Sequence, residues 1–195
     1  MKVAVIKYNA GNIRSVAFAL ERLGIEFSIT DNHEEIQGAD KVIFPGVGEA
    51  SSTMKYLQEF KLDRVIKELK QPVLGICLGM QLMCSFSEEN DTRCLGIFDE
   101  PVRLFKPKNK EKVPHMGWNS LTLTNGWMDA DISGQYVYFV HSYYVPVNPH
   151  TTAITDYILP FSSAIKKDNF YAVQFHPEKS SAVGENILRS FINKS

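Results

Sequence analysis

One cysteine has neighbours that could make it a nucleophile. In the segment Gly75-Ile76-Cys77-Leu78-Gly79, a glycine lies two residues away on each side of Cys77, directly after the apolar run Val73–Ile76. This is the layout of a nucleophile elbow, a sharp strand-to-helix turn that exposes the reactive side chain and requires small neighbours. The N-terminus of the following helix would favour the thiolate. The pattern therefore predicts an activated thiolate at Cys77.

The other cysteines, Cys84 and Cys94, have no such flanking glycines and are interpreted as small buried side chains. Three cysteines without a C-x-x-C pair argue against a disulfide framework and against a zinc site, so no metal or cofactor is expected. The first residues contain no apolar run long enough for a signal peptide. A reducing cytoplasm is the expected location.

A thiolate nucleophile needs an imidazole base and a third group that orients the imidazole. The tripeptide His176-Pro177-Glu178 follows the predicted strand Phe170–Phe175. Two residues apart in extended geometry, His176 and Glu178 would point the same way. Glu178 could then accept from one ring nitrogen while the other faces Cys77.

The remaining histidines have weaker settings. His33 and His150 lie in polar, turn-rich segments and are expected to be solvated. His115 falls in a predicted glycine-containing loop and His141 at the end of a predicted strand, so either could line a site. Neither has a carboxylate nearby in the sequence that could orient it.

A glycine-rich loop could stabilise the charge that such chemistry develops. Pro45-Gly46-Val47-Gly48 directly follows the predicted strand Val42–Phe44, at the sheet edge where ligands of α/β folds bind. The amides of Val47 and Leu78 are the candidate oxyanion donors, each contributing on the order of 3 kcal/mol if well placed. Because glycines make a peptide rotation easy, the loop could also act as a switch.

The elements that must position these groups alternate between strands and helices in the first hundred residues, which indicates a mainly parallel α/β sheet. Predicted strands here are Val3–Ile6, Phe27–Thr30, Val42–Phe44 and Val73–Ile76, with helices at about 12–23, ended by Gly24, and around Leu62–Leu69. Later β-rich segments are Val102–Phe105, Leu121–Leu123, Tyr136–Tyr144, Ala153–Thr155, Ser163–Lys167 and Phe170–Phe175. These are expected to add antiparallel strands, and a last helix is expected at Val183–Ile192.

Size and charge set further limits. A chain of 195 residues with 44% apolar content suits a single domain over residues 1–195. The net charge of −1 provides no general attraction for nucleic acid or anionic membranes, and no apolar run reaches the length of a membrane span. The charged segment Lys106–Lys112 is expected to be a solvated loop.

The motifs resemble a known family. The segment Pro72–Met83, read with the distal His176-Pro177-Glu178, resembles the class I, triad-type glutamine amidotransferases. The Pro45–Gly48 loop is similar to that of the glutaminase subunit of imidazole glycerol phosphate synthase. Further matching segments are Tyr8–Asn12, Pro114–Asn119 and His176–Ser180, which together cover the chain almost end to end. The chain departs from the family pattern at Ala10 and at Glu49-Ala50, where an aromatic residue is frequent.

This resemblance implies a three-layer, flavodoxin-like α/β fold and a reaction. L-glutamine would be hydrolysed to glutamate and ammonia through a γ-glutamyl thioester on Cys77, with His176 and Glu178 completing the triad. Val47 and Leu78 would form the oxyanion hole. The implied substrate contacts are Gly46, Gly48, Gln81, Ser142 and Tyr143.

The resemblance also implies a partner, a (β/α)8-barrel cyclase subunit in a heterodimer. That subunit would use the ammonia to form imidazole glycerol phosphate and aminoimidazole carboxamide ribotide in histidine biosynthesis. The positions that match the barrel-facing ones are Asn12, Trp118, Asn119 and Lys179. A closed passage keeps ammonia unprotonated, and the family answer to wasteful hydrolysis is activity controlled by the partner, with the Gly46–Val47 peptide as the natural switch.

Three alternatives remain open at this point. A related amidotransferase subunit could serve the amidination of a surface sugar. A free-standing cysteine hydrolase acting on γ-glutamyl peptides would use a similar fold, although the Trp118-Asn119 segment argues against it. A non-catalytic flavodoxin-like binding module is disfavoured by the combination of Cys77, His176 and Glu178.

Overall fold

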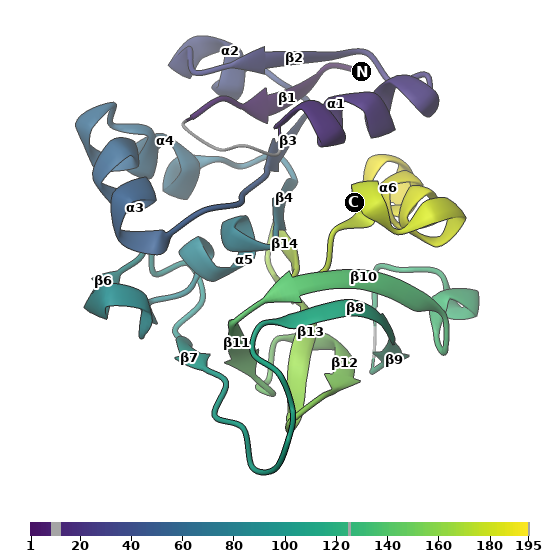
Figure 1. Ribbon diagram of the computed structural model, residues 1–195. Helices are drawn as coiled ribbons and strands as arrows, with labels where there is room; N and C mark the ends of the chain where they lie inside the picture. The colour runs from purple at the N-terminus through teal and green to yellow at the C-terminus, as the bar shows by residue number, and fades with distance from the viewer. Residues whose placement is uncertain (9–12, 125, 195) are drawn as a thin grey trace.

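A computed structural model of the chain describes residues 1–8, 13–124 and 126–194. The parallel half of its central sheet carries the predicted first strands (Figure 1). These strands lie in the order β2-β1-β3-β4-β14, with every neighbouring pair parallel. Their bounds are β1 (Val3–Ile6), β2 (Phe27–Thr30), β3 (Lys41–Phe44), β4 (Val73–Ile76) and β14 (Phe170–Val173). All but β2 are buried along their whole length, as expected for apolar runs covered on both faces.

Helices cover both faces of this half, so the predicted layered α/β architecture is confirmed (Figure 1). On one face lie α1 (Ile13–Arg22) and α6 (Ser181–Lys194). On the other lie α2 (His33–Gln37), α3 (Ala50–Glu59), α4 (Leu62–Glu68) and α5 (Leu78–Met83). Gly24 ends α1 in the left-handed region at φ 67°, as predicted, whereas Asn12 lies outside the described residues.

Two helices were not predicted from the pattern. Helix α3 buries Met54 and Leu57 but is otherwise rich in serine and other polar residues, so its apolar periodicity is weak. Helix α2 is only five residues long, and Asn32 caps it by accepting from the Glu35 N–H at 3.0 Å. In both cases tertiary packing stabilises a helix that the sequence signals only faintly.

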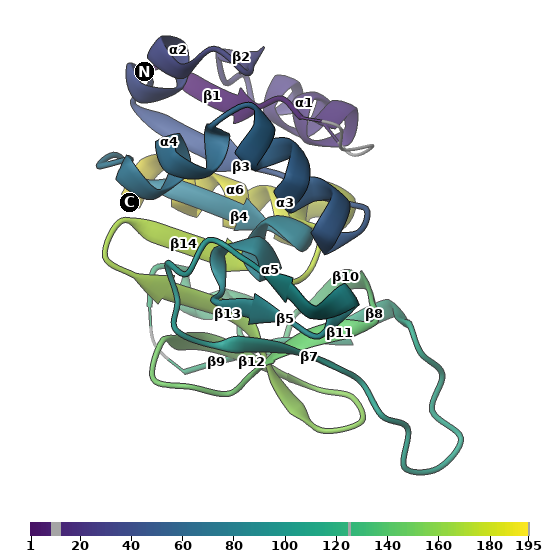
Figure 2. The ribbon, with the colours of Figure 1, turned by 90° about the vertical axis from the view of Figure 1, so that its left-hand side faces the viewer.

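The antiparallel half extends the same sheet beyond β14, as expected (Figure 2). β13 (Pro160–Lys167) pairs antiparallel with β14 and leads to β11 (Tyr143–Pro146), β7 (Pro101–Leu104), β5 (Phe86–Ser87) and β6 (Thr92–Arg93). β12 (Thr151–Asp156) pairs with β13 and with β9 (Thr122–Leu123). The charged segment 106–112 lies in the β7–β8 connection, which projects from this half in Figure 2.

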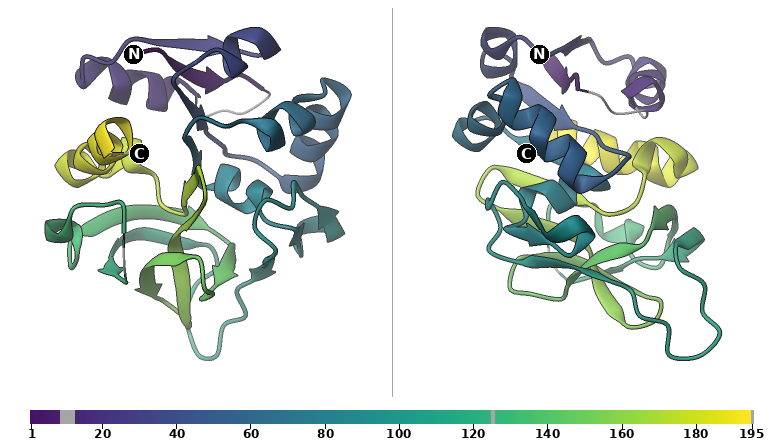
Figure 3. Two further views of the ribbon diagram at one scale, coloured as in Figure 1. Left: turned by 180° about the vertical axis from the view of Figure 1, so that it is seen from behind. Right: turned by 60° about the vertical axis from the view of Figure 1, so that its left-hand side comes forward.

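A separate two-stranded ribbon corrects two predictions. β8 (His115–Ser120), expected to be a loop, pairs antiparallel with β10 (Tyr136–His141). The expected continuous strand Tyr136–Tyr144 breaks at Ser142, where the chain leaves this ribbon and joins the main sheet as β11. The residue types in β8 have little preference for a strand, so the strand is stabilised by its pairing with β10. Figure 3 shows β10 beside α6, which separates it from α1.

Three short 3-10 helices complete the described elements, η1 (Glu89–Asp91), η2 (Ala130–Ile132) and η3 (Pro177–Lys179). Within the described ranges, no helix is long and apolar enough to cross a membrane.

Candidate active site

Three segments meet at the carboxyl edge of three neighbouring strands. The Pro45–Gly48 loop follows β3, Cys77 follows β4, and the His176 turn follows β14. Because β3, β4 and β14 are adjacent and parallel, residues more than 100 positions apart in sequence converge there. The topology thereby places the predicted nucleophile between the predicted base and the predicted oxyanion loop.

Cys77 has the backbone geometry of a nucleophile elbow. Its φ is 53° and its ψ −107°, in a region that non-glycine residues rarely adopt, directly before α5. Gly79 is required for the turn, since an added Cβ would lie 2.1 Å from the Phe44 carbonyl oxygen. The thiol is less accessible than the elbow pattern predicted, because Cys77 is only 6% exposed.

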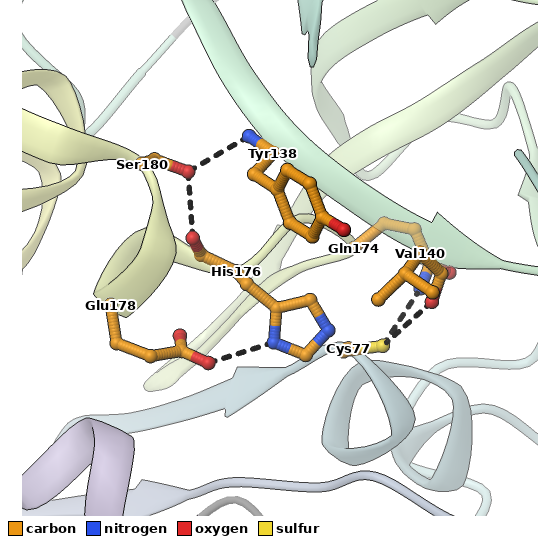
Figure 4. Close-up of polar contacts among 7 residues, drawn as sticks. All are labelled: Cys77, Tyr138, Val140, Gln174, His176, Glu178 and Ser180. Carbon is orange, nitrogen blue, oxygen red and sulfur yellow. Dashed lines mark hydrogen bonds and ion pairs between the residues drawn. The ribbon is translucent and has the colours of Figure 1, made fainter. Parts of the chain in front are cut away.

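His176 and Glu178 are paired within the protein interior. Nδ1 of His176 lies 2.8 Å from Oε1 of Glu178, and both residues are buried. The ring of His176 lies between Glu178 and Cys77 (Figure 4). The predicted extended geometry was wrong: β14 ends at Val173, and residues 177–179 form η3 because Pro177 begins a tight turn.

The protonation of His176 reflects opposing influences. Burial lowers the pKa of the imidazole, but the charge of the Cys77 thiolate and hydrogen bonds to Cys77 and Glu178 outweigh it and raise the pKa to about 10. At neutral pH this favours an imidazolium beside the sulfur. The pair thus has the arrangement expected of a cysteine nucleophile and a general acid.

The ribbon strand β10 holds the His176 turn in place. The Tyr138 carbonyl accepts from the His176 N–H at 2.9 Å, and the Tyr138 N–H donates to Ser180 Oγ at 2.9 Å. Ser180 Oγ also donates to the His176 carbonyl at 2.6 Å (Figure 4). The backbone of Tyr138 therefore ties the ribbon directly to the predicted base.

Gln174 contacts the nucleophile and was not predicted. It is fully buried, and its Nε2 lies 3.6 Å from Cys77 Sγ, within reach of a weak N–H···S bond (Figure 4). Its Oε1 accepts from Gln81 Nε2 at 3.0 Å. The position gave a faint signal, a polar residue inside the otherwise apolar run Phe170–Phe175.

The oxyanion donors are not both available in this structure. The Leu78 N–H donates to the Gly46 carbonyl at 3.3 Å, so this carbonyl faces the place where a donor is needed. Tyr8 Oη donates to the Pro45 carbonyl and borders the loop. A Cβ at position 46 would lie 2.6 Å from Tyr8 Oη and 2.8 Å from the Gly79 nitrogen. The roles assigned to Val47 and Leu78 stay predictions that require the Gly46–Val47 peptide to rotate.

A cleft of about 360 Å³ opens next to Cys77. Its lining includes four of the five predicted substrate contacts, Gly48, Gln81, Ser142 and Tyr143, together with Val47 and Leu78. Gly46 does not line the cleft in this structure. Val140 and Pro114 line it as well, and so does His141, which the sequence left open.

Glu89 adds a carboxylate to the cleft lining that sequence reasoning missed. Its Oε2 accepts from the Ala50 N–H at 2.7 Å. Burial, together with the nearby charge of Glu49, raises the pKa of Glu89. In the sequence it lies within an acidic, polar stretch typical of a loop, which gave no indication that it returns to the cleft.

The predicted interface residues have different surroundings. Trp118 is 53% exposed on β8, and Lys179 is exposed on η3. The Asn119 side chain instead points inward, and its Nδ2 donates to the Asp156 carbonyl at 2.8 Å. Asn12 lies outside the described residues.

Known proteins match both the sequence and the fold of this chain. Residues 4–194 match the family described as glutamine amidotransferase class-I. Proteins named imidazole glycerol phosphate synthase subunit HisH from Bacteroides fragilis and Bacteroides thetaiotaomicron are 63% and 60% identical to the chain. The alignments cover 98% and 99% of this chain and 99% and 100% of those proteins.

Solved structures agree on the fold at low sequence identity. A protein described as a glutamine amidotransferase has a TM-score of 0.73 at 18% identity, covering 97% of this chain and 96% of that one. PurLQS from Thermotoga maritima has a TM-score of 0.72 at 14% identity, covering 98% and 97%. The chain belongs to the class I glutamine amidotransferases and, within them, to the family of imidazole glycerol phosphate synthase subunit HisH.

Proposed function

We propose that this protein is the glutaminase subunit of an imidazole glycerol phosphate synthase. In this function it hydrolyses L-glutamine and delivers ammonia to a (β/α)8-barrel cyclase subunit in histidine biosynthesis. The observation that carries the proposal is the meeting of Cys77 with the paired His176 and Glu178 beside a cleft of about 360 Å³. The identity of 60–63% to HisH subunits over nearly the full length supports the choice of pathway.

The first half of the reaction forms a thioester. Cys77 Sγ attacks the side-chain amide carbon of glutamine, and the amide oxygen becomes an oxyanion as the C–S bond forms. The His176 imidazolium gives its proton to the amide nitrogen, the C–N bond breaks and ammonia leaves. Glu178 holds the imidazole in the tautomer and orientation that this transfer needs, in the manner of the third member of a triad.

The second half releases glutamate. The neutral His176 takes a proton from a water molecule as the oxygen attacks the thioester carbon. The C–S bond then breaks, which restores the thiolate beside an imidazolium. Within the cleft, Gln81, Ser142 and Tyr143 would hold the substrate, and the Glu89 carboxylate would accept a hydrogen bond from its α-ammonium group.

We infer that the structure represents a resting state of the oxyanion loop. The Gly46 carbonyl, bonded to the Leu78 N–H, would repel the developing oxyanion. Rotation of the Gly46–Val47 peptide would replace that carbonyl with the Val47 N–H and release the Leu78 N–H. Contact with the barrel subunit would favour the rotated form, so ammonia would be made only where it can be used.

The exposed ribbon is the proposed docking face for the barrel. Trp118 packs against Tyr138 across the ribbon, with ring centroids 6.1 Å apart, and the Tyr138 backbone holds the His176 turn. Lys179 and Asn12 complete the proposed contact, and Asn119 supports it from behind through its bond to the Asp156 carbonyl. We also propose a cytoplasmic location, which suits three cysteines that are all free thiols.

A variant of the nucleophile tests the function. In a reconstituted complex with the barrel subunit, Cys77→Ala should abolish glutamine-dependent synthesis and leave ammonia-dependent synthesis unchanged. Persistent glutamine-dependent turnover would contradict the assignment of Cys77.

A rate comparison tests the dependence on a partner. Glutamine hydrolysis by the isolated chain should be slow and should rise on adding the barrel subunit with its ligand bound. Equal rates in the two conditions would contradict partner control and indicate a free-standing hydrolase.

A further inference from the structure

A second pair of buried histidines lies beside the proposed active site, and the thioester chemistry uses neither of them. His115 on β8 and His141 at the end of β10 are directly opposite in the ribbon register. Nδ1 of His115 lies 3.0 Å from Nε2 of His141, and the residues are only 3% and 5% exposed. Burying two imidazoles costs free energy unless their nitrogens are hydrogen-bonded, so the partners of each ring nitrogen matter.

The donor and the acceptor of each hydrogen bond in this histidine pair can be assigned. Nδ1 of His141 lies 2.7 Å from the Tyr143 carbonyl, which can only accept, so that nitrogen carries the proton. A neutral imidazole has one N–H, so Nε2 of His141 must accept from Nδ1–H of His115. Nε2 of His115 is then an acceptor, and Asn119 Nδ2 lies 3.4 Å from it.

Both rings are held in the neutral form that this direction requires. Burial lowers the pKa of His115 to about 4. Burial, with the nearby His115 and His176, lowers the pKa of His141 to about 3, although its bond to the Tyr143 carbonyl opposes the shift. Stacking on Tyr157 and Phe139, with ring centroids 4.1 and 4.8 Å away, fixes the plane of His115.

The inner end of the chain reaches the substrate cleft. The Tyr143 carbonyl accepts from His141 and also from Gln81 Nε2 at 3.1 Å. His141, Ser142 and Tyr143 line the cleft that contains Cys77. The segment 141–143 is where the chain crosses from the ribbon to the main sheet. There the Ser142 carbonyl accepts from the Phe105 N–H at 3.0 Å, and the Tyr143 carbonyl is held by His141 and Gln81.

The outer end lies next to the exposed face of the ribbon. Asn119 follows Trp118, the most exposed aromatic side chain of β8, and a second bond to the Asp156 carbonyl at 2.8 Å holds the amide. The same side chain thus donates to the carbonyl of the last residue of β12 and to the histidine pair.

We propose that Asn119, His115 and His141 form a positioning relay that holds the Tyr143 carbonyl and thereby the Ser142–Tyr143 wall of the glutamine cleft. His115 and His141 are positioning residues, because they act on the substrate through Tyr143. The relay links the ribbon face to substrate affinity, a route separate from the oxyanion loop. This inference rests on the proposed glutaminase function.

Two variants of His115 separate hydrogen bonding from packing. His115→Phe keeps an aromatic ring against Tyr157 and Phe139 but removes both ring nitrogens. His115→Asn loses the ring but can place an amide N–H near the position of Nδ1, where it can still donate to His141. In the complex with the barrel subunit, His115→Phe should raise the KM for glutamine by about fivefold, as for one lost hydrogen bond of about 1 kcal/mol, with little change in kcat.

The order of the two variants decides the proposal. His115→Asn should have a KM closer to that of the unmodified protein than His115→Phe has. The reverse order, or equal KM values in the two variants, would overturn the proposal and assign His115 to packing alone. Ammonia-dependent synthesis should stay unchanged in both variants, which confirms that the barrel subunit itself is active.

A measurement without turnover keeps this inference separate from the proposed function. Ring ¹⁵N NMR of the isolated chain at neutral pH should show the neutral Nδ1–H tautomer for both His115 and His141. An Nε2–H tautomer or a protonated ring at either position would overturn the relay even if glutamine is hydrolysed. The correct tautomers in a chain that never hydrolyses glutamine would instead contradict the proposed function.

Discussion

The two sides of Cys77 differ in readiness for catalysis. On the β14 side, His176 and Glu178 are paired at 2.8 Å, and three hydrogen bonds, two of them to Tyr138 of β10, hold the His176 turn. On the β3 side, the Leu78 N–H is bonded to the Gly46 carbonyl, so the oxyanion site is closed. In the proposed reaction, the proton-transfer groups are therefore assembled in advance, whereas stabilisation of the oxyanion requires one peptide to rotate.

This difference has a physical basis. Building the triad requires buried side chains with strong mutual interactions, which would be slow and costly to assemble in each cycle. Rotating a glycine-containing peptide changes few contacts and needs little energy. Control by the oxyanion loop thus allows a large change in rate without disturbing the core, since a single oxyanion donor is worth about 10²–10³ in kcat.

The largest effect on glutamine hydrolysis is expected from a substitution in the His176–Glu178 pair. His176→Asn removes the general acid and base, so glutamine hydrolysis in the complex should fall by about 10⁴-fold or more. Steady-state release of glutamate measures the effect. Ammonia-dependent synthesis is the control, and a loss of less than tenfold would exclude His176 as the base.

The oxyanion loop that follows β3 can be disturbed by one added methyl group. Gly46→Ala would place a Cβ 2.6 Å from Tyr8 Oη and 2.8 Å from the Gly79 nitrogen. The added Cβ would also lie 2.8 Å from the Leu78 Cβ, so it would displace the turn that carries the Leu78 N–H, and we expect partner-stimulated hydrolysis to fall by about 10²–10³-fold, the value of one oxyanion donor. Gly38→Ala, where only the Glu34 carbonyl lies as close as 3.0 Å, is the matched control away from the site. Unchanged hydrolysis by the Gly46 variant would show that the packing of this loop against Leu78 does not support catalysis.

Binding of the barrel subunit, which is proposed to control the oxyanion loop, can be weakened by a substitution in the ribbon. Trp118 is 53% exposed, so its removal should leave the fold unchanged. Trp118→Ala should weaken binding of the barrel subunit by about 10–100-fold, as for an interface residue worth about 1–3 kcal/mol. Titration calorimetry measures the loss, with Phe18→Ala on α1, another exposed aromatic residue, for comparison. Unaltered affinity in the Trp118 variant would move the docking face elsewhere.

The smallest effect concerns stability in acid. Because the folded-state pKa of His115 is lowered to about 4, below the unfolded value of about 6.5, the unfolded chain holds an extra proton between these values. Stability therefore rises with pH across this window and is lost as the pH falls. His115→Phe should reduce that slope by up to about 1.4 kcal/mol per pH unit. Urea unfolding between pH 4.5 and 6.5, within about the window set by these pKa values, measures it; parallel curves would contradict the buried neutral state.

Much of this site could be predicted because its residues sit at strand ends with strong apolar patterns. Val73–Ile76 and the glycines around Cys77 indicate both the strand and the elbow, and the structure confirms them. The ribbon strand β8 could not be predicted, since its segment of histidine, glycine, tryptophan and asparagine is stabilised by pairing with β10, far along the chain. Glu89 and Gln174 were missed for the same reason, because their contacts depend on tertiary structure rather than on spacing.

Neither the orientation of the Gly46–Val47 peptide nor the hydrogen bond between His115 and His141 could be predicted from the sequence. A Pro-Gly-Val-Gly loop predicts that a switch is feasible, but only the contact of the Leu78 N–H with the Gly46 carbonyl reveals its position. Likewise, no local pattern connects His115 with His141, which are 26 residues apart and meet only through the ribbon register.

The low solvent exposure of Cys77 affects how readily its sulfur is oxidised. Oxidation of cysteine to sulfenic and higher acids depends on thiolate character and on access. Cys77 has a cation beside it, yet it is only 6% exposed, with the Gln174 amide and the Val140 carbonyl close to its sulfur. The nucleophile is thus protected between turnovers, because the same contacts that orient the sulfur limit the approach of peroxide and bulky electrophiles.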